Sequence, residues 1–348
     1  MRAEGINRRE FSFRATLAAS AVGFRPAWAQ TRLERSKVLI GLAGRSEISL
    51  LPLAIADRLG YFRAEGLDVE LIDFPSSGSA LQALLNGAVH VSASGYEQIL
   101  NQSARGHFLQ SFVLMAQSPA VAVGVSIRNL PHFKTVADLR GKKMGVGAPG
   151  SASHAIAHWV MARAGLTQGD VMLVHFGGAA EALAAFQLNQ IDATSYGDPI
   201  VTMLEQKRIL HLVADSRTMK GRQALFGGPL PGSCLYAHSA FVQQNPLTAQ
   251  AMTLAVVRAL RWIQTAGPSD LMKVIPEPFM IGDRALYLTA IGKGREAVSP
   301  DGVMPKSGPM SAFRVFSEVE PGFGVERIDL SKTYTNEFAA VAKAHFKV

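Results

Sequence analysis

Short apolar runs alternate with helical patterns through the first two thirds of the chain. The apolar runs at residues 68–74 and 171–176 each follow a helical stretch that ends in Gly-Leu, and turns rich in glycine or serine separate the elements. Strands that alternate with helices in this way form parallel sheets with helices on their faces. The pattern therefore predicts an α/β protein.

The same order of elements occurs twice. Residues 74–97 match residues 176–199 at a constant offset of 102, and residues 37–44 match 143–150 at an offset of 106, glycines included. We interpret the repeat as two similar α/β lobes. The stretch 246–267 carries apolar residues at helical spacing after a proline, and we expect this helical C-terminal part to return to the first lobe.

The N-terminus has the pattern of an export signal. Arg8 and Arg9 precede a short apolar run at 15–24, and the small residues Ala27 and Ala29 follow it. That order of basic, apolar and small-residue regions is typical of a cleaved signal, and the twin arginine favours the route that exports folded proteins. We predict that residues 1–29 are a twin-arginine signal, that cleavage follows Ala29, and that the mature protein is periplasmic.

Charge and cysteine content narrow the class of protein. The chain has 35 Lys and Arg against 27 Asp and Glu, and three of the eight excess positive charges lie in the predicted signal. The densest basic stretch left is RGKK at 140–143, so we expect no nucleic-acid partner. Cys234 is the only cysteine. No disulfide can form within the chain, and we expect a buried thiol.

Residues 145–150 spell G-x-G-x-x-G, the pattern of a dinucleotide-binding turn. That interpretation requires an acidic residue at the end of the next strand, which here ends in His175-Phe176, and Pro149 removes a backbone donor inside the turn. His154 and His158 lie one helical turn apart, but no third metal ligand is evident. We therefore expect neither a cofactor nor a metal.

In open α/β sheets, ligands bind beyond the carboxyl ends of the strands. The repeat places three such loops in each lobe, and serines stand where two of the following helices begin, a position that favours an anion or caps the helix itself. If the lobes face one another, six loops line one cleft. These loops are Arg45–Ser49, Ser76–Ser79, Ser94–Glu97, Ser151–His154, Gly177–Ala180 and Tyr196–Pro199.

Several stretches resemble a known family. Residues 52–95, which include GYFRAEGLDVEL, are similar to the opening lobe of the SsuA/THI5-like (NMT1-like) substrate-binding proteins of the nitrate, sulfonate, taurine and thiamine-pyrimidine group. Residues 137–154, 182–199 and 328–344 resemble later landmarks of the family. One departure is His90, where the family usually has an acidic residue and the second copy has Asp192.

The resemblance implies a type II periplasmic-binding-protein fold, with two α/β lobes joined by two hinge crossings and a ligand cleft between them. We expect lobe I to comprise residues 30–118 and 216–348, lobe II residues 119–215, and the hinges to lie near 117–121 and 212–217. Carried over by loop position, the expected ligand contacts are Glu47, Ser77, Ser79, Tyr96, Glu97, Ser151, Ser153, His154, Tyr196 and Asp198.

Each expected contact has a structural alternative. Glu47 and Glu97 can be solvated loop charges, Asp198 can cap the helix that follows it, and Tyr96 can be a packing residue. The serines and helix N-termini favour a sulfonate, carboxylate or phosphonate head, whereas the acidic side chains favour an amine or a ring N–H. A sulfonate, an aromatic acid, a pyrimidine or a related compound thus fits the expected cleft.

The function implied is capture of a small organic solute and its delivery to an ABC importer, that is, to a permease and ATPase complex in the inner membrane. We expect a monomer without catalytic activity. Two alternatives remain: an enzyme on the same fold, of the thiamine-pyrimidine or menaquinone-pathway type, or a ligand-sensing partner of a membrane receptor.

Overall fold

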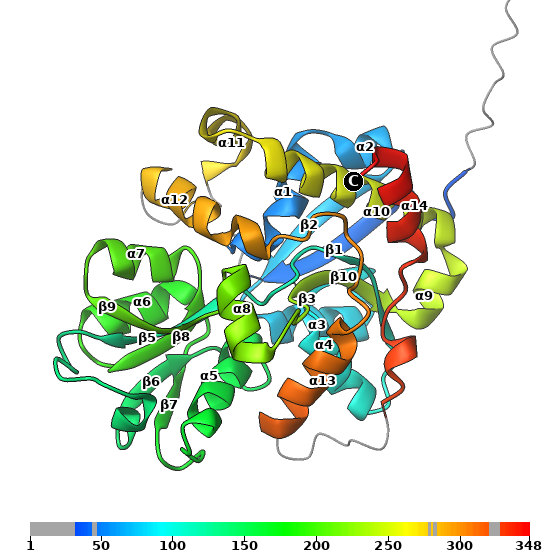
Figure 1. Ribbon diagram of the computed structural model, residues 1–348. Coiled ribbons are helices and arrows are strands. Elements are labelled where there is room, and N and C mark those ends of the chain that lie inside the picture. The colour runs from blue at the N-terminus through cyan, green and yellow to red at the C-terminus, as the bar shows by residue number, and fades with distance from the viewer. Residues whose placement is uncertain (1–31, 44–46, 278–279, 281–283, 320–327) are drawn as a thin grey trace, which may run out of the picture. The chain divides into compact units, whose positions relative to one another are not determined.

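Two five-stranded sheets organise the chain in a computed structural model, which describes residues 32–43, 47–277, 280, 284–319 and 328–348 (Figure 1). The first sheet has the order β2-β1-β3-β10-β4 and the second the order β7-β6-β8-β5-β9. The strands are β1 (Lys37–Ala43), β2 (Asp68–Phe74), β3 (Val91–Gly95), β4 (Leu109–Leu114), β5 (Val121–Ser126), β6 (Lys143–Val146), β7 (Met172–His175), β8 (Ala193–Gly197), β9 (Leu210–Asp215) and β10 (Ser233–His238).

Helices connect the strands and cover the sheets (Figure 1). Between the strands lie η1 (Ile48–Leu50), α1 (Leu51–Arg58), α2 (Tyr61–Ala64), α3 (Ser77–Leu85), α4 (Glu97–Ala104), η2 (Val136–Leu139), α5 (Ala152–Arg163), α6 (Ala179–Gln187), α7 (Ile200–Gln206) and α8 (Met219–Phe226). After β10 follow α9 (Ser239–Gln244), α10 (Pro246–Thr265), α11 (Pro268–Val274), α12 (Arg284–Gly294), η4 (Arg295–Ala297), α13 (Gly308–Val319), η6 (Leu330–Lys332) and α14 (Glu337–Phe346).

The expected α/β class and two-lobed fold are confirmed, with one correction to the sheets. Each sheet is mixed, because β10 runs antiparallel to β3 and β4, and β5 runs antiparallel to β8 and β9. These two strands are the ones that follow a crossing from the other sheet. The repeat contains no copy of them, so the pattern that predicted parallel strands could not include them.

The internal repeat is a repeat of structure. β1, β2, α3 and β3 of the first sheet correspond to β6, β7, α6 and β8 of the second. His90 and Asp192 stand at matching positions, and both accept a hydrogen bond from the backbone N–H of the first strand of their sheet: His90 Nδ1 from Leu39 at 3.0 Å and Asp192 Oδ2 from Lys143 at 2.9 Å. His90 therefore accepts the same kind of backbone hydrogen bond as Asp192, although its side chain is of another type.

The two crossings between the sheets are hydrogen-bonded to each other. Ser118, in the first crossing, donates to the Ser216 carbonyl at 2.6 Å, and Ser216 in turn donates to the Val121 carbonyl at 2.7 Å. The N–H of Gly232 donates to the Ala116 carbonyl at 2.9 Å. A side chain at Gly232 would collide with the backbone of Ser118. The two segments that connect the sheets are therefore packed directly against each other.

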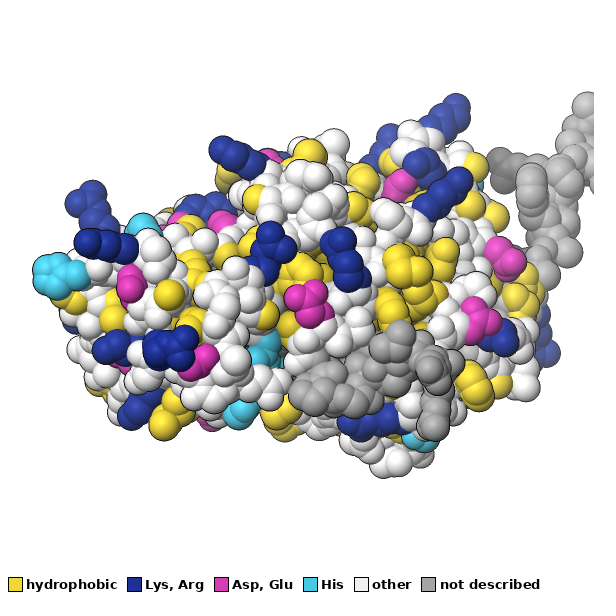
Figure 2. Space-filling view, turned by 60° about the horizontal axis from the view of Figure 1, so that its bottom comes forward, with side chains coloured by type: hydrophobic (Ala, Val, Ile, Leu, Met, Phe, Trp, Pro, Cys, Tyr) yellow, Lys and Arg dark blue, Asp and Glu magenta, His cyan; other side chains and the backbone are white. Residues whose placement is uncertain are grey.

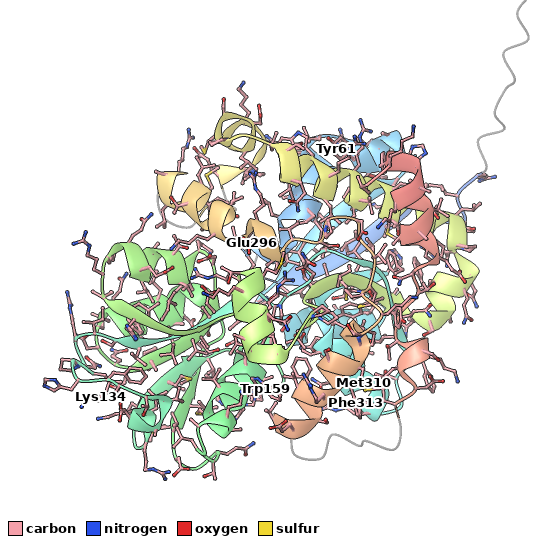
Figure 3. The ribbon with its side chains drawn as sticks, in the orientation of Figure 1. Tyr61, Lys134, Trp159, Glu296, Met310 and Phe313 are labelled. Carbon is pink, nitrogen blue, oxygen red and sulfur yellow. The ribbon has the colours of Figure 1, made fainter. Side chains whose placement is uncertain are left out.

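The expected hinges fit the first crossing better than the second. Residues 117–120 lie between β4 and β5, but residues 212–215 belong to β9, and the return crossing continues through α8 to Ser233. The N–H of Met219, where α8 begins, donates to the Glu296 carboxylate at 2.8 Å, and Figure 3 shows Glu296 beside this helix. Helix α8 thus bridges the crossing and the C-terminal part of the chain. The lobe boundaries themselves stay a prediction.

The remaining expectations have different outcomes. Cys234 is fully buried, as expected for a thiol in the core, and burial raises its pKa to about 12. On the face shown in Figure 2, Lys and Arg side chains are interspersed with Asp and Glu. No helix among the described residues is long and apolar enough to cross a membrane. The predicted signal at 1–29, with Arg8, Arg9 and Ala29, lies outside the described residues.

The shared role of His90 and Asp192 can be tested by exchange. We expect His90→Ala to lower the free energy of unfolding by about 1–2 kcal/mol, because the N–H of Leu39 loses its acceptor. His90→Asp, which imports the acceptor of the second copy, should lose less. Urea unfolding measures both. Equal stability of His90→Ala and the wild type would contradict the role assigned to this side chain.

Candidate functional site

A cavity of about 380 Å³ lies between the two sheets. All six loops expected to line one cleft contribute to it, three from the carboxyl ends of β1, β2 and β3 and three from those of β6, β7 and β8. Residues of both crossings, among them Pro119, Arg217 and Gly232, complete the wall. Parts far apart in the sequence therefore meet around one space of the size that small-molecule sites have.

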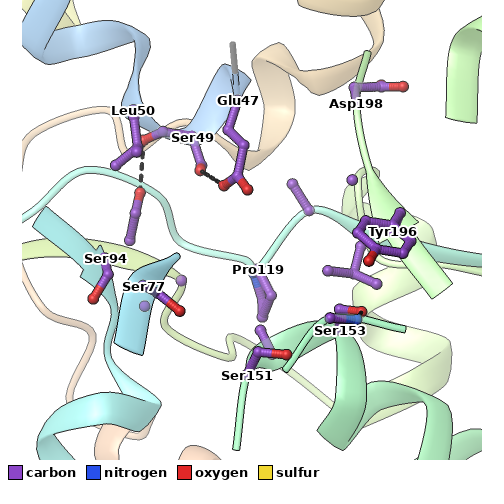
Figure 4. Close-up of a pocket in the computed structure, with 18 of the residues that line it drawn as sticks. Glu47, Ser49, Leu50, Ser77, Ser94, Pro119, Ser151, Ser153, Tyr196 and Asp198 are labelled. Atoms are coloured by element: carbon purple, nitrogen blue, oxygen red, sulfur yellow. Dashed lines mark hydrogen bonds between the residues drawn. The ribbon is translucent and has the colours of Figure 1, made fainter. Parts of the chain in front are cut away.

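The cavity brings together seven of the ten expected contacts. Figure 4 shows the Glu47 carboxylate pointing into the space and Tyr196 on the opposite wall. The sequence predicted that Glu97 belongs to a loop, whereas in the structure it is the first residue of α4. The expected residues that line the cavity are Glu47, Ser77, Glu97, Ser151, Ser153, Tyr196 and Asp198.

Three expected contacts, Ser79, Tyr96 and His154, lie outside the lining, and each has another partner. Ser79 forms a capping box with Ser76 at the start of α3. Tyr96 is fully buried, and its hydroxyl bonds the Thr333 side chain, so its ring offers no surface for stacking. The Nε2 atoms of His154 and His158 lie 3.2 Å apart. We therefore remove these three residues from the expected set.

The serines at the start of α5 have structural roles. Ser151 is the N-cap and accepts a hydrogen bond from the N–H of His154 at 3.3 Å. The Ser153 hydroxyl accepts from the N–H of Gly147 at 2.8 Å and donates to the Ser195 carbonyl at 2.6 Å. These bonds hold the loop after β6 against β8. The helix-capping alternative is thus correct for Ser151, and Ser153 fixes the loop.

Asp198 belongs to a buried ion-pair network. Its carboxylate accepts from the N–H of Thr202 at 2.8 Å and from Arg217, whose Nη1 lies 3.1 Å from both carboxylate oxygens. Arg217 also pairs with Asp215 at 2.8 Å and Glu205 at 3.1 Å. Figure 4 shows the Asp198 side chain directed away from the centre of the cavity. Asp198 therefore caps α7 and neutralises Arg217.

Glu97 is different, because its carboxylate is buried and only partly satisfied. The side chain is 3% exposed, and its Oε2 atom has no hydrogen-bond partner among the residues that the structure describes. Its carboxylate lies directly against Gly95, where any side chain would collide with it. Burial raises the pKa of Glu97 to about 7 and Glu47 adds to this, whereas hydrogen bonds from the N–H groups of Glu97 and Ala152 act in the opposite direction.

Glu47 is the second unusual carboxylate. Its side chain is exposed to the cavity, and Ser49 donates a long hydrogen bond of 3.4 Å to it. Desolvation of the carboxylate by the surrounding protein nevertheless raises its pKa to about 7. Tyr196 completes the group, because its buried hydroxyl has no hydrogen-bond partner in the described part of the chain. Burial, and after it the charge of Glu47, raises the pKa of this hydroxyl. Glu47 and Glu97 thus place two carboxylates with raised pKa values at the cavity, beside the hydroxyl of Tyr196.

Comparison with known proteins decides the family. The family model described as NMT1/THI5 like matches residues 48–267. The chain belongs to this family. A solved protein of Bordetella bronchiseptica RB50 is 42% identical, with a TM-score of 0.86 over 91% of this chain and all of that one. The binding protein YtlA of Bacillus subtilis is 23% identical over 72% of this chain and 74% of its own.

Solved transport proteins share the fold of this family member at lower identity. The aliphatic sulphonate-binding protein SsuA of Escherichia coli is 20% identical, with a TM-score of 0.68 over 87% of this chain and 99% of its own. The nitrate-binding protein NrtA of Synechocystis is 15% identical, with a TM-score of 0.71 over 91% of this chain and 90% of its own. The fold is that of periplasmic binding proteins of ABC import systems.

Sequence reasoning missed the lining residues that come from the crossings. Arg217, Gly232 and Pro119 lie in segments without a repeat counterpart, so their place at the cavity could not be deduced from loop equivalence. The signal available for Arg217 was the acidic residue Asp215 two positions before it, at the end of an apolar run.

The first glycine of the G-x-G-x-x-G pattern, Gly145, is required by packing, since a side chain there would meet Ile191 and Phe176.

The raised pKa of Glu97 predicts a stability penalty at neutral and alkaline pH. Between about pH 4.5 and 7 the folded protein keeps a proton that the unfolded chain has lost, so stability falls as the pH rises through this range. We expect Glu97→Gln to stabilise the ligand-free protein by about 1–3 kcal/mol at pH 8 and to change it little at pH 4. Urea unfolding at the two pH values measures this. A destabilised variant at pH 8 would contradict the assignment.

Proposed function

We propose that the mature chain is a periplasmic solute-binding protein that encloses a small organic solute between its two lobes and delivers it to an ABC importer. In this proposal the protein binds the solute and releases it unchanged. Its partner is the permease and ATPase complex in the inner membrane. Membership of the NMT1/THI5-like family and a fold shared with import-system binding proteins support the proposal.

The observation that carries the proposal is the cavity between the sheets. Three loops at the strand ends of each sheet form its wall, and residues of both crossings complete it. A rotation about the crossings would open this space to solvent without breaking either sheet, which is how two-lobed clamps work. The lobes in this proposal are 30–118 with 216–348, and 119–215. Its contacts are Glu47, Ser77, Glu97 and Tyr196, since hydrogen bonds within the protein already occupy Ser151, Ser153 and Asp198.

The sulfonates, aromatic acids and pyrimidines that the resemblance suggests remain candidate solutes. SsuA and NrtA are named for a sulphonate and for nitrate, and at 20% and 15% identity they share the fold rather than a solute with this chain. The charges of the lining bear directly on the choice and are treated in the next subsection.

A thermal-shift screen of the mature protein tests solute binding. The screen covers sulfonates, aromatic acids, pyrimidines and amines, and a specific solute at a hundred times its Kd should stabilise the protein by about 2.7 kcal/mol. Small-angle scattering should then show a smaller radius of gyration. Ser77→Ala from the first lobe and Tyr196→Phe from the second should both weaken binding, each by about 0.5–1.5 kcal/mol.

Tyr61→Phe is the matched control for Tyr196→Phe. Tyr61 is the first residue of α2 and does not line the cavity (Figure 3). The guanidinium carbon of Arg258 lies 4.2 Å from the centre of its ring. Its variant should bind as the wild type does. A tight solute whose affinity depends on one lobe alone, with an unchanged radius of gyration, would contradict the clamp. Chemical turnover of a bound compound would instead favour an enzyme on this fold.

Export can be tested independently of the solute. Changing Arg8 and Arg9 together to Lys should leave the precursor in the cytoplasm, because the export receptor reads that pair. Cell fractionation and the N-terminal sequence of the secreted protein measure the effect, and mature wild-type protein should begin at Gln30. Normal periplasmic levels of the double variant would refute a twin-arginine signal.

A further inference from the structure

The lining of the cavity carries more negative than positive charge. Among the lining residues that the structure describes, the charged side chains are Glu47, Glu97, Asp198 and Arg217. All three guanidinium nitrogens of Arg217 donate to the carboxylates of Asp198, Glu205 or Asp215, and the side chain is 2% exposed. Its charge is therefore used within the protein, and Glu47 and Glu97 have no cationic partner in the described lining.

The position expected to hold an anion is already in use. Ser151 caps the N-terminus of α5, and the N–H of Ala152, the first residue of that helix, stabilises the Glu97 carboxylate. An anionic head at this point would be repelled by both carboxylates of the cavity. The electrostatics thus disfavour the charge that a helix N-terminus by itself would attract.

Within the described lining, two buried polar atoms have no hydrogen-bond partner. The first is Oε2 of Glu97, an acceptor on a side chain of which only 3% is exposed. The second is the hydroxyl of Tyr196. Buried groups of this kind are costly unless a partner is supplied. Glu97 begins the helix that follows β3 of the first sheet, and Tyr196 belongs to β8 of the second, so the two atoms come from different lobes.

We propose that the solute is an organic cation whose N–H head, an ammonium, amidinium or guanidinium, is bound between the carboxylates of Glu47 and Glu97. The proposal rests on the solute-binding function and narrows it. The body of the solute packs against Phe176 and the ring of Tyr196, which are the aromatic side chains of the described lining. A cation provides N–H donors for carboxylate oxygens and cancels the repulsion between Glu47 and Glu97.

Solutes of one shape and three charges give the direct test. Benzamidine, benzamide and benzoate are planar and nearly isosteric, and they carry positive, zero and negative charge at pH 8. Propylammonium, propanol and propanesulfonate form a second set without a ring. We expect the cation of at least one set to raise the melting temperature of the mature protein, and to bind at least about tenfold more tightly than its neutral counterpart in calorimetry.

Variants attribute the preference to the carboxylates. Glu97→Gln and Glu47→Gln should each lower the affinity for the cation at least about tenfold and leave the neutral compound unaffected. Glu70→Gln is the matched control, since Glu70 is an exposed residue of β2 that does not line the cavity. It removes the same charge from the protein and should leave cation binding unchanged.

Each contrary result has a distinct meaning. Tighter binding of benzoate or propanesulfonate would overturn the cationic class and leave the solute-binding function standing. Failure of both cations to bind would also overturn it, while a hit among other compounds of the wider screen would preserve the function. Arg45, which lies outside the described residues, precedes Glu47 by two positions. Cation binding by Arg45→Gln but not by the wild type would show that the chain supplies the positive charge itself.

Discussion

The arrangement of the whole molecule depends on two crossings that are bonded to each other. Ser118 of the first crossing donates to the Ser216 carbonyl, and the Ser216 hydroxyl accepts from the N–H of Val121. Gly232 allows the return segment to pass directly against the first crossing. Each crossing then delivers one antiparallel strand, β5 or β10, which lies next to the edge strand of the sheet it enters. This constraint places the carboxyl ends of the parallel strands of both sheets around one space. The position of the cavity therefore follows from the order and direction of the strands, and not from particular side chains.

The sequence predicted the part of this arrangement that is repeated. Matching glycines and apolar runs placed β1 with β6 and β3 with β8, and the rule for strand ends then identified all six loops of the cavity. It could not predict the antiparallel strands, or the site of Arg217, because neither has a counterpart in the other copy. Long-range pairing is decided by packing of segments that a local pattern does not connect.

Side-chain direction limited the prediction of contacts. Tyr96 and Glu97 are neighbours at the end of β3, yet one is buried against Thr333 and the other faces the cavity. Ser79 and His154 lie in the first turn of their helices, where hydrogen bonds with Ser76 and His158 occupy their side chains. Loop position identifies a short segment near a ligand. Which residue of that segment reaches the ligand depends on the helix phase, and a shift of one residue turns a side chain by about 100°.

Glu47 and Glu97 connect stability to function. Desolvation by the surrounding protein raises the pKa of both carboxylates to about 7, although Glu47 is exposed to the cavity and Glu97 is buried. Closing the empty cavity therefore requires either that protons bind or that the negative charges approach each other in a poorly solvated space. A solute that supplies positive charge and N–H donors removes this penalty at the moment of closure. The same two carboxylates that destabilise the empty closed form would then couple closure to the presence of the solute, because the differential affinity for the closed state is what a ligand contributes to such an equilibrium.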